Sequence, residues 1–211
     1  MSTRASPVVG VMISGRGSNL QALIDAERAG APYRIAAVIS NVPDAPGLDK
    51  ARAAHIPAIA IDHRPFNRDR AAWEGVAMRA FQDQGVGFVA LAGFMRVLTP
   101  RFIGAYAGHL INIHPSLLPL FRGLDSHARA IESGMALAGC SVHHVTEGVD
   151  EGQIIGQAAI PIAPNDTPET LADRLIQAEH ALYPACLSQL VTGKPAPAPK
   201  MDGAIFSLRA P

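Results

Sequence analysis

Short apolar runs alternate with helix-like segments over the first half of this chain, and this alternation most limits the folds that the chain can adopt. The runs read as buried strands, and residues 18–29 place Leu20, Leu23 and Ile24 on one helix face. Strands and helices in this order form a mostly parallel sheet that is covered on both faces. The expected strands are residues 8–13, 35–40, 58–61, 88–92 and 110–113, and the expected helices are residues 18–29, 47–54 and 70–83.

The pattern changes after Pro119. Two strand-like runs, residues 139–146 and 153–162, flank an acidic turn with glycines, which suggests antiparallel strands added to the parallel sheet. Helices are expected at residues 126–133 and 167–190. Thr167 suits the N-cap of the second helix and Pro168 its first position. We therefore predict an α/β fold: an open, mostly parallel twisted sheet with helices on both faces and antiparallel strands toward the C-terminal half.

The length of 211 residues suits one domain and allows a sizeable core. We expect a single domain over residues 1–193, followed by a C-terminal extension over residues 194–211. Residues 194–200 alternate proline with alanine, which is typical of an extended spacer. The last residues are expected to form a peripheral strand or an ordered tail.

Composition argues against several classes of protein. Hydrophobic residues make up 48% of the chain and charged residues 17%, which disfavours disorder. Lys+Arg and Asp+Glu both number 18, so neither net charge nor a basic run favours nucleic acid as a partner. No segment reaches the roughly 18 apolar residues of a membrane span, and no signal core is present. With two cysteines in no metal-type pair, we expect a reduced cytoplasmic protein, either a monomer or a weak homodimer.

The segment of residues 112–119 carries the most informative side chains. Asn112 and His114 end an apolar strand two residues apart, so they project from the same face. Pro115 then discourages a regular continuation of the strand. An amide beside a titratable imidazole at a strand tip suits polar chemistry. Taken alone, a buried histidine that is satisfied by a neighbour explains the pattern equally well.

The glycine-rich run of residues 14–20 follows the first strand and opens the first helix. Glycines let a ligand approach the backbone closely, and the unpaired N–H groups of a helix start favour phosphate. Ser18 and Asn19 add side-chain donors, but neither the Walker lysine pattern nor the full dinucleotide fingerprint is present. A small molecule with one phosphate is therefore favoured over a nucleoside triphosphate. The structural alternative is a tight turn with a polar cap.

Residues 94–98 follow an expected strand, at the position where open α/β sheets bind ligands. Their apolar side chains could line a pocket for a flat heterocycle, while backbone groups read its polar edge. Taken alone, ordinary core packing is the better explanation of this segment.

Asp150 lies in an acidic turn that could be no more than a solvated loop. A carboxylate beside His114, however, would stabilise the imidazolium and tune its proton affinity for acid/base chemistry near neutral pH. His143 and His144 are adjacent on an expected strand, so only one of them can face a site. Neither histidine has a partner at a persuasive metal-binding spacing, and zinc binding is not favoured.

Together these motifs resemble the phosphoribosylglycinamide formyltransferase family, also called GAR transformylase. The His-Pro-Ser-Leu-Leu-Pro run is shared by several folate-dependent formyl enzymes, and its combination with the Ser-Gly-x-Gly-Ser-Asn loop is much more specific. The resemblance spans residues 8–190. The matching segments are residues 14–21, 91–96 and 112–119, the Asp150 turn, and residues 177–180.

The resemblance implies formyl transfer from 10-formyltetrahydrofolate to the primary amine of glycinamide ribonucleotide in purine synthesis, with no metal required. It implies that His114 acts as acid and base, that Asn112 stabilises the oxyanion, and that Asp150 tunes His114. The amine is itself a nucleophile, so no acyl-enzyme is needed. Ser116 is therefore not expected to be a nucleophile.

The resemblance also implies the binding residues. Gly17, Ser18 and Asn19 would bind the phosphate region of the ribonucleotide, and Glu179 would contact its ribose. The folate would be bound by Arg70, Met95, Arg96, Val97, Leu98 and Asn112. Some relatives carry histidine at the Asp125 position, so Asp125 and His127 are candidates for a substrate loop or for supporting contacts.

Three other functions remain open at this stage. Methionyl-tRNA formyltransferase should carry a substantial C-terminal RNA-binding region, and this chain ends soon after its last expected helix. Formyltetrahydrofolate deformylase is typically preceded by a small regulatory domain, and none fits before Val8. A non-catalytic phosphate-binding module would explain the glycine-rich loop but would leave Asn112, His114 and Asp150 without a shared purpose.

Overall fold

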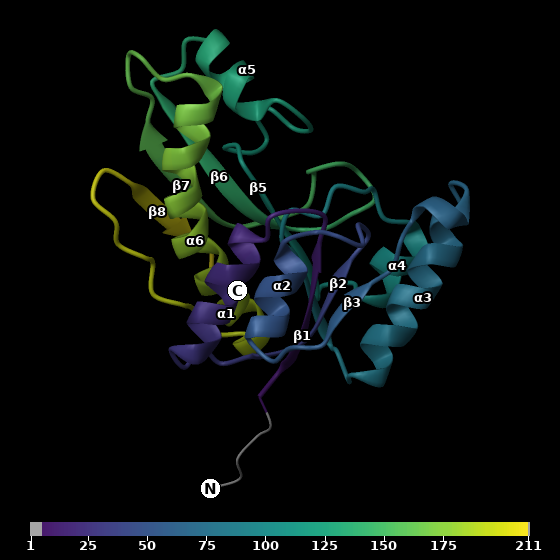
Figure 1. The fold of residues 1–211 in the computed structure, drawn as a ribbon. Coiled ribbons are helices and arrows are strands. Elements are labelled where there is room, and N and C mark those ends of the chain that lie inside the picture. Colours follow the sequence, from purple (N-terminus) through teal and green to yellow (C-terminus); the bar gives the residue numbers. More distant parts are fainter. Residues whose placement is uncertain (1–5, 211) are drawn as a thin grey trace, which may run out of the picture. The chain divides into compact units, whose positions relative to one another are not determined.

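The computed structural model describes residues 6–210 of the chain (Figure 1). The chain divides into two compact units, one that ends at Leu110 and one that begins at Ile111. Among the residues described, no helix is both long enough and apolar enough to cross a membrane.

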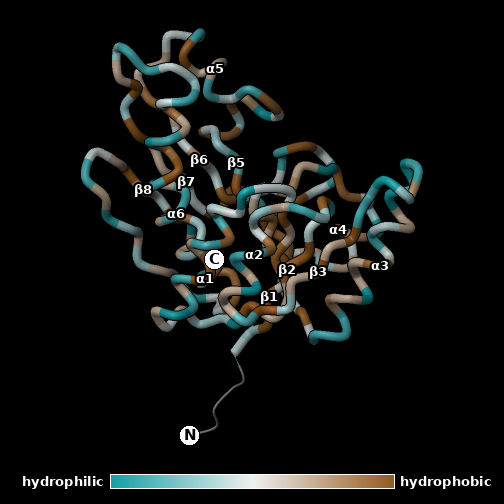
Figure 2. Tube along the Cα trace, in the orientation of Figure 1, coloured by the Kyte–Doolittle hydropathy of each residue, from teal (hydrophilic) through white to brown (hydrophobic). Residues whose placement is uncertain are grey.

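The first unit is built on four parallel strands in the order β3-β2-β1-β4. The residues of β1, β2 and β4 are mostly apolar and buried, whereas those of β3 are partly or fully exposed, and the tube in Figure 2 is brown along β1 and β2. The strands are β1 (Val8–Ile13), β2 (Arg34–Ser40), β3 (Ala58–Ala60) and β4 (Phe88–Leu91). The helices are α1 (Ser18–Arg28), α2 (Gly47–Ala53), α3 (Arg70–Asp83), α4 (Pro100–Ala105) and a 3₁₀ turn, η1 (Arg64–Phe66).

Helices cover both faces of these parallel strands. A Cβ atom on Gly10 of β1 would lie 2.5 Å from the Phe81 ring, so this face of β1 packs directly against α3. Ile13 points to the opposite face, where its Cδ1 would lie 2.6 Å from a Cβ on Gly47 at the start of α2. The helices therefore lie on both sides of the sheet, as predicted. Helix α1 packs beside α2, and α3 beside α4.

The second unit holds four antiparallel strands in the order β5-β6-β7-β8. They are β5 (Leu110–His114), which starts at the last residue of the first unit, β6 (Leu137–His144), β7 (Ile154–Pro161) and β8 (Ile205–Leu208). Two helices, α5 (Ser126–Glu132) and α6 (Pro168–Thr192), complete the unit, and α6 packs on β6 and β7. A Cβ on Gly156 would lie 2.7 Å from Sγ of Cys186, which shows how closely α6 approaches β7.

The predicted fold class is confirmed, and most element boundaries agree to within a residue or two. Thr167 caps α6 through a reciprocal pair of hydrogen bonds with Thr170, and Pro168 occupies the first turn as predicted. Strand β6 runs from Leu137 to His144, two residues earlier than the sequence suggested. At its C-terminal end the prediction was wrong because Thr146 lies in the solvent-exposed segment after the strand, although its β-branched side chain is typical of a strand.

Candidate functional site

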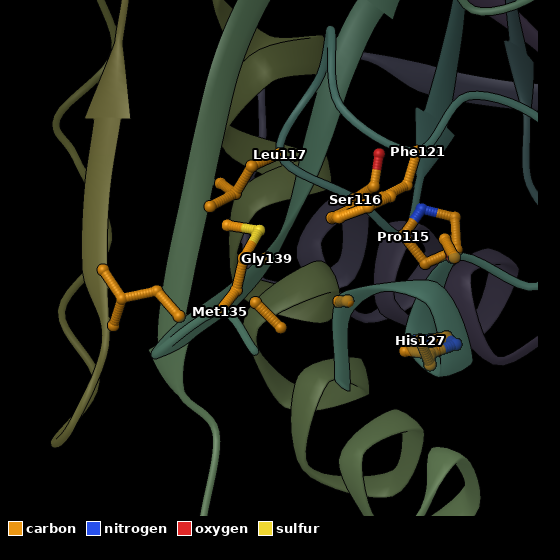
Figure 3. Close-up of a pocket in the computed structure, with 11 residues that line it drawn as sticks. Pro115, Ser116, Leu117, Phe121, His127, Met135 and Gly139 are labelled. Atoms are coloured by element: carbon orange, nitrogen blue, oxygen red, sulfur yellow. The ribbon is translucent and has the colours of Figure 1, made fainter. Parts of the chain in front are cut away.

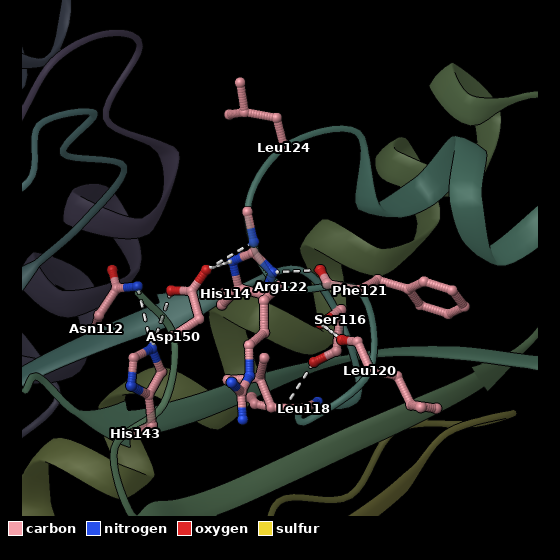
Figure 4. A network of polar contacts seen from close by, with 12 residues as sticks. Asn112, His114, Ser116, Leu118, Leu120, Phe121, Arg122, Leu124, His143 and Asp150 are labelled. Atoms are coloured by element: carbon pink, nitrogen blue, oxygen red, sulfur yellow. Dashed lines mark hydrogen bonds and ion pairs between the residues drawn. The ribbon is translucent and has the colours of Figure 1, made fainter. Parts of the chain in front are cut away.

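His114 is buried at the end of β5, between a carboxylate and a backbone carbonyl (Figure 4). Its Nδ1 lies 3.2 Å from Oδ2 of Asp150, and its Nε2 lies 3.0 Å from the carbonyl oxygen of Phe121. A carbonyl oxygen only accepts hydrogen bonds, so Nε2 must carry the proton in that contact. Both ring nitrogens thus face acceptors, and the doubly protonated ring satisfies both of them.

Asp150 stands at the centre of the polar cluster. Its Oδ2 also accepts the backbone N–H of Gly123 at 3.0 Å, and its Oδ1 lies 3.5 Å from Nε2 of His143. Burial opposes ionisation, but the hydrogen bonds from His143 and Gly123 and the charges of the two histidines outweigh it, so the pKa of Asp150 is lowered. A group with such a pKa is an ionised carboxylate at neutral pH.

Asn112 and His143 meet through the register of the sheet. They are paired across β5 and β6, and Nδ2 of Asn112 lies 3.3 Å from Nε2 of His143. Nδ1 of His143 donates to the backbone carbonyl of His144 at 2.8 Å. Nε2 of the same ring lies between the Asn112 amide and Oδ1 of Asp150, so it donates to the carboxylate when the ring is doubly protonated and can accept from the amide only when the ring is neutral. The expectation that only one of the two adjacent histidines faces the site is confirmed for His143, which is 2% exposed.

His143 is the residue that sequence reasoning did not include among the site residues. One signal in the sequence was available, namely that His143 and His144 are adjacent on a strand. Adjacent residues of a strand point to opposite faces of the sheet, so one of the two histidines had to lie on the same face as Asn112 and His114. The pairing of β5 with β6 then decides that His143 lies opposite Asn112, and a sequence does not display that register.

The loop after His114 is held in place by its own hydrogen bonds. The Ser116 hydroxyl donates to the carbonyl of Leu120 at 2.6 Å. The Ser141 hydroxyl donates to the carbonyl of Ser116 at 2.7 Å and accepts the N–H of Leu118 at 3.0 Å. These contacts fix the backbone that presents the Phe121 carbonyl to His114.

A small pocket lies between this loop and α5 (Figure 3). Its free volume is about 10 Å³, which admits about one water molecule. Ser116, Phe121 and His127 are among its lining residues. Burial, and then the charge of His114, lower the pKa of His127, so that its ring is neutral at pH 7. Asp125 precedes α5 in the left-handed conformation, with φ of 57°, and its side chain makes no capping hydrogen bond to the helix.

The glycine-rich loop of the first unit has the geometry of a tight strand-to-helix turn. Gly17 adopts φ of 67°, and a Cβ atom there would lie 2.8 Å from Cα of Gly47, so only glycine fits. Ser18 and Asn19 begin α1 immediately afterwards. Nζ of Lys50, on α2, donates to the carbonyl of Gly17 at 3.2 Å. The structure thus adds a positive charge to this loop that the sequence did not point to.

The segment predicted to line the heterocycle pocket alternates buried and exposed side chains. Leu98 is buried, Arg96 is half-buried, and Met95 and Val97 are 75% and 51% exposed. Nη1 of Arg70 donates to the carbonyl of Val97 at 3.2 Å. The Arg70 side chain therefore contacts the backbone of the 95–98 segment, which was predicted to bind the folate together with Arg70.

Glu179 lies half-buried on α6, in the second unit. Burial strongly raises the pKa of the Cys140 thiol on β6, and the nearby charge of Glu179 raises it further. Helix α6 packs on β6 and β7, in the unit that contains Asn112, His114 and Asp150. Gly17, Ser18, Asn19 and the 95–98 segment belong to the first unit.

Residues 8–187 match the model of a protein family described as formyl transferase. This chain belongs to the formyl transferase family. The match extends over most of both compact units and contains every candidate site residue named above. The predicted resemblance is confirmed at the level of the family.

Individual relatives within the family can be compared with this formyl transferase by sequence. It is 48% identical over 188 residues to the trifunctional purine biosynthetic protein adenosine-3 of Drosophila pseudoobscura, a match that covers 88% of this chain but 14% of that protein. The chain spans 14% to 18% of the trifunctional relatives of this name that it matches. It is 42% identical to the phosphoribosylglycinamide formyltransferase of Escherichia coli, with 87% of each chain covered.

A solved structure gives the same likeness for this formyl transferase. The phosphoribosylglycinamide formyltransferase of Brucella melitensis is 47% identical with a TM-score of 0.85, and the match covers 89% of this chain and 96% of that one.

Among residues 6–210, no group of three or more histidine, cysteine, aspartate or glutamate side chains could hold a metal ion.

Proposed function

We propose that this formyl transferase moves the formyl group of 10-formyltetrahydrofolate to the primary amine of glycinamide ribonucleotide, in de novo purine biosynthesis. The observation that carries the proposal is the His114 ring, held between the Asp150 carboxylate and the Phe121 carbonyl beside the Asn112 amide. The names of the relatives that match over most of their own length support the choice of acceptor.

The reaction begins when the amine attacks the formyl carbon, which places negative charge on the formyl oxygen. The Asn112 amide has two N–H groups; one is directed at His143, and the other can donate to this oxyanion. Nε2–H of His114 can supply a second donor. In the structure this N–H is donated to the Phe121 carbonyl, so the formyl oxygen would take the place of that carbonyl.

The second half of the reaction transfers one proton. The attacking amine loses a proton, the bond from the formyl carbon to N10 breaks, and N10 gains a proton. His114 is the group that we assign to this transfer, directly or through a water molecule. Asp150 keeps its negative charge beside Nδ1 and so stabilises the imidazolium form of His114. This is how Asp150 would tune His114, the role that the resemblance implied.

The ligands are assigned to groups with matching chemistry. Gly17, Ser18 and Asn19 would bind the phosphate at the start of α1, with Lys50 adding a positive charge. Glu179 would contact the ribose hydroxyls. The folate ring would lie on the apolar surface of Met95 and Val97, with Arg70, Arg96 and Leu98 as further contacts in the first unit. No metal has a role in these steps.

The decisive experiment incubates the protein with 10-formyltetrahydrofolate, with and without glycinamide ribonucleotide. We expect formylated ribonucleotide and tetrahydrofolate only when both substrates are present. Release of formate at a comparable rate without the ribonucleotide would instead indicate a deformylase. Binding of both ligands without turnover would indicate a binding module. The His114→Ala variant should bind both ligands and show strongly reduced turnover.

Three further assignments rest on the sequence. We propose that residues 1–193 form a single formyltransferase domain, that the protein acts in the cytoplasm, and that it is a monomer or a weak homodimer. Sedimentation at several protein concentrations tests the last of these.

A further inference from the structure

A buried glutamate holds one end of the loop of residues 93–99. Glu74 lies on α3 and is 3% exposed. Its Oε1 accepts the backbone N–H of Thr99 at 2.8 Å, and its Oε2 accepts a short hydrogen bond from the Thr99 hydroxyl. Thr99 in turn caps α4, since its Oγ1 accepts the N–H of Phe102 at 3.4 Å. One carboxylate thus fixes both the backbone and the side chain of the last residue of the loop.

Burying the Glu74 carboxylate costs free energy, so we ask what its two hydrogen bonds stabilise in return. A buried carboxylate loses its hydration, and that loss is offset only by hydrogen bonds of good geometry. Glu74 directs both of its oxygens at Thr99, and hydrogen bonds to an ionised group are stronger than those between neutral groups. An apolar residue would fill the same space at the α3 surface without that loss. The position of Thr99 is what the carboxylate secures.

The other parts of the loop are attached to α3 as well. Arg70, one turn before Glu74, donates to the carbonyl of Val97 at 3.2 Å. Trp73, the residue before Glu74, stacks on the Phe94 ring with centroids 5.7 Å apart and planes 25° from parallel. Three side chains from the first part of α3 thereby hold Phe94, Val97 and Thr99, and with them the shape of the loop.

The amino-terminal part of the loop is attached to the end of β1. The Ser14 hydroxyl accepts the N–H of Met95 at 2.8 Å and donates to Oδ1 of Asn41 at 2.6 Å. The Ser14 N–H donates to the carbonyl of Gly93 at 3.1 Å. With both ends held, the loop still exposes Met95 and Val97, so it displays apolar surface from a fixed backbone.

We propose that Glu74 is a positioning residue for the folate cosubstrate: by fixing Thr99 it holds the 93–99 loop in the shape that presents Met95 and Val97 to the pterin ring. This inference rests on the proposed function, which assigns the loop to folate. A site that is ordered before binding spares the ligand the free energy of ordering it. Loss of Glu74 should therefore weaken folate binding, whereas ribonucleotide affinity and kcat change little because Glu74 acts through the loop.

The test compares four variants by isothermal titration with tetrahydrofolate and, separately, with glycinamide ribonucleotide. Glu74→Ala should raise the Kd for tetrahydrofolate about tenfold, since it removes two hydrogen bonds to a charged acceptor. Glu74→Gln should bind like the unchanged protein, because its amide can accept the Thr99 N–H and donate to the Thr99 hydroxyl. Thr99→Val retains the N–H and should lie between them. Glu27→Ala is the matched control, because Glu27 accepts an N–H from Ile35 at 3.2 Å, away from the loop.

Trp73 gives a readout that does not depend on activity. It is the one tryptophan of the chain and it stacks on Phe94 of the loop, so its emission reports the loop's conformation. Glu74→Ala should change this emission and Glu74→Gln should restore it, while urea unfolding verifies that each variant is folded. Should Glu74→Ala itself be unfolded, Thr99→Val supplies the same comparison.

The outcomes separate this inference from the function on which it rests. If the unchanged protein binds tetrahydrofolate and transfers formyl groups, but folded Glu74→Ala or Thr99→Val binds tetrahydrofolate equally well, the inference alone is overturned. If the unchanged protein neither binds tetrahydrofolate nor transfers formyl groups, the proposed function fails, and the ligand named here fails with it. A parallel loss of affinity for both ligands would also overturn the inference, because it would indicate a general structural role.

Discussion

Oδ2 of Asp150 lies 3.2 Å from Nδ1 of His114, and both side chains are almost fully buried. The backbone of Asp150 is left-handed at this point, with φ of 53°, a conformation that Asn and Asp tolerate better than most residues. The carboxylate is thus carried by one of the few side chains that the backbone accepts without large strain. This pairing makes Asn the informative replacement at position 150.

Asp150→Asn should retain the fold and lose most of its activity. The amide keeps the shape and tolerates the left-handed backbone, but it no longer places a negative charge beside His114. We expect kcat to fall by roughly 10²-fold or more, the usual scale for acid/base catalysis, with ligand affinities nearly unchanged. Asp173→Asn, at an exposed position of α6, is the matched control. Steady-state kinetics and titrations decide the matter, and near-normal turnover in Asp150→Asn would remove Asp150 from the mechanism.

The lowered pKa of Asp150 predicts a pH-dependent part of the stability. Its folded-state pKa lies below the ordinary value of 3.8, although burial works against this, so ionised Asp150 stabilises the fold. That stabilisation is complete above the ordinary pKa and is lost as pH falls through the folded-state pKa. The unfolding free energy of the unchanged protein should therefore exceed that of Asp150→Asn at pH 6, and the difference should shrink below about pH 4. Urea unfolding from pH 7 to pH 2.5 measures it; a difference that stays constant would contradict the assignment.

His143 should support catalysis without replacing His114. Its Nε2 lies near both the Asn112 amide and Oδ1 of Asp150, so it positions the two groups that flank the reaction. The asparagine side chain in His143→Asn is too short to keep both contacts, so this variant should lower kcat about tenfold with little change in KM. His55→Asn is the control, since His55 is exposed and Asn accepts its left-handed φ of 59°. A drop in kcat as large as that of His114→Ala would instead make His143 an essential group.

Sequence periodicity was sufficient to predict the bounds of those helices and strands whose burial depends only on their own residues. The strand at residues 8–13 and the helix at residues 70–83 have their predicted bounds, because each buries a continuous apolar run or stripe of its own. Asn112 and His114 are predicted as site residues on the same kind of signal, and both lie in one strand, where their spacing puts them on one face.

Contacts between distant segments were beyond the sequence. His143 joins the site through the register between β5 and β6, which depends on the packing of the whole sheet. The Phe121 carbonyl that faces His114 is a backbone atom, and every residue carries one. Lys50 reaches Gly17 across 33 positions of the chain, and Glu74 reaches Thr99 across 25. No local pattern marks such pairs, so the supporting residues of a site are harder to predict than its reactive ones.

Lys50 should strengthen binding of the ribonucleotide phosphate. Its ammonium group uses one donor on the Gly17 carbonyl, which places it at the loop that we assign to the phosphate, and two donors of the group remain for a ligand. Lys50→Met keeps the length of the side chain and removes the charge. It should raise the Kd for glycinamide ribonucleotide about twofold to fivefold at low salt, less at high salt, and leave the Kd for tetrahydrofolate unchanged. Lys194→Met, at an exposed position after α6, controls for the loss of one charge. Isothermal titration at two salt concentrations tests this, and an unchanged ribonucleotide Kd would place the phosphate elsewhere.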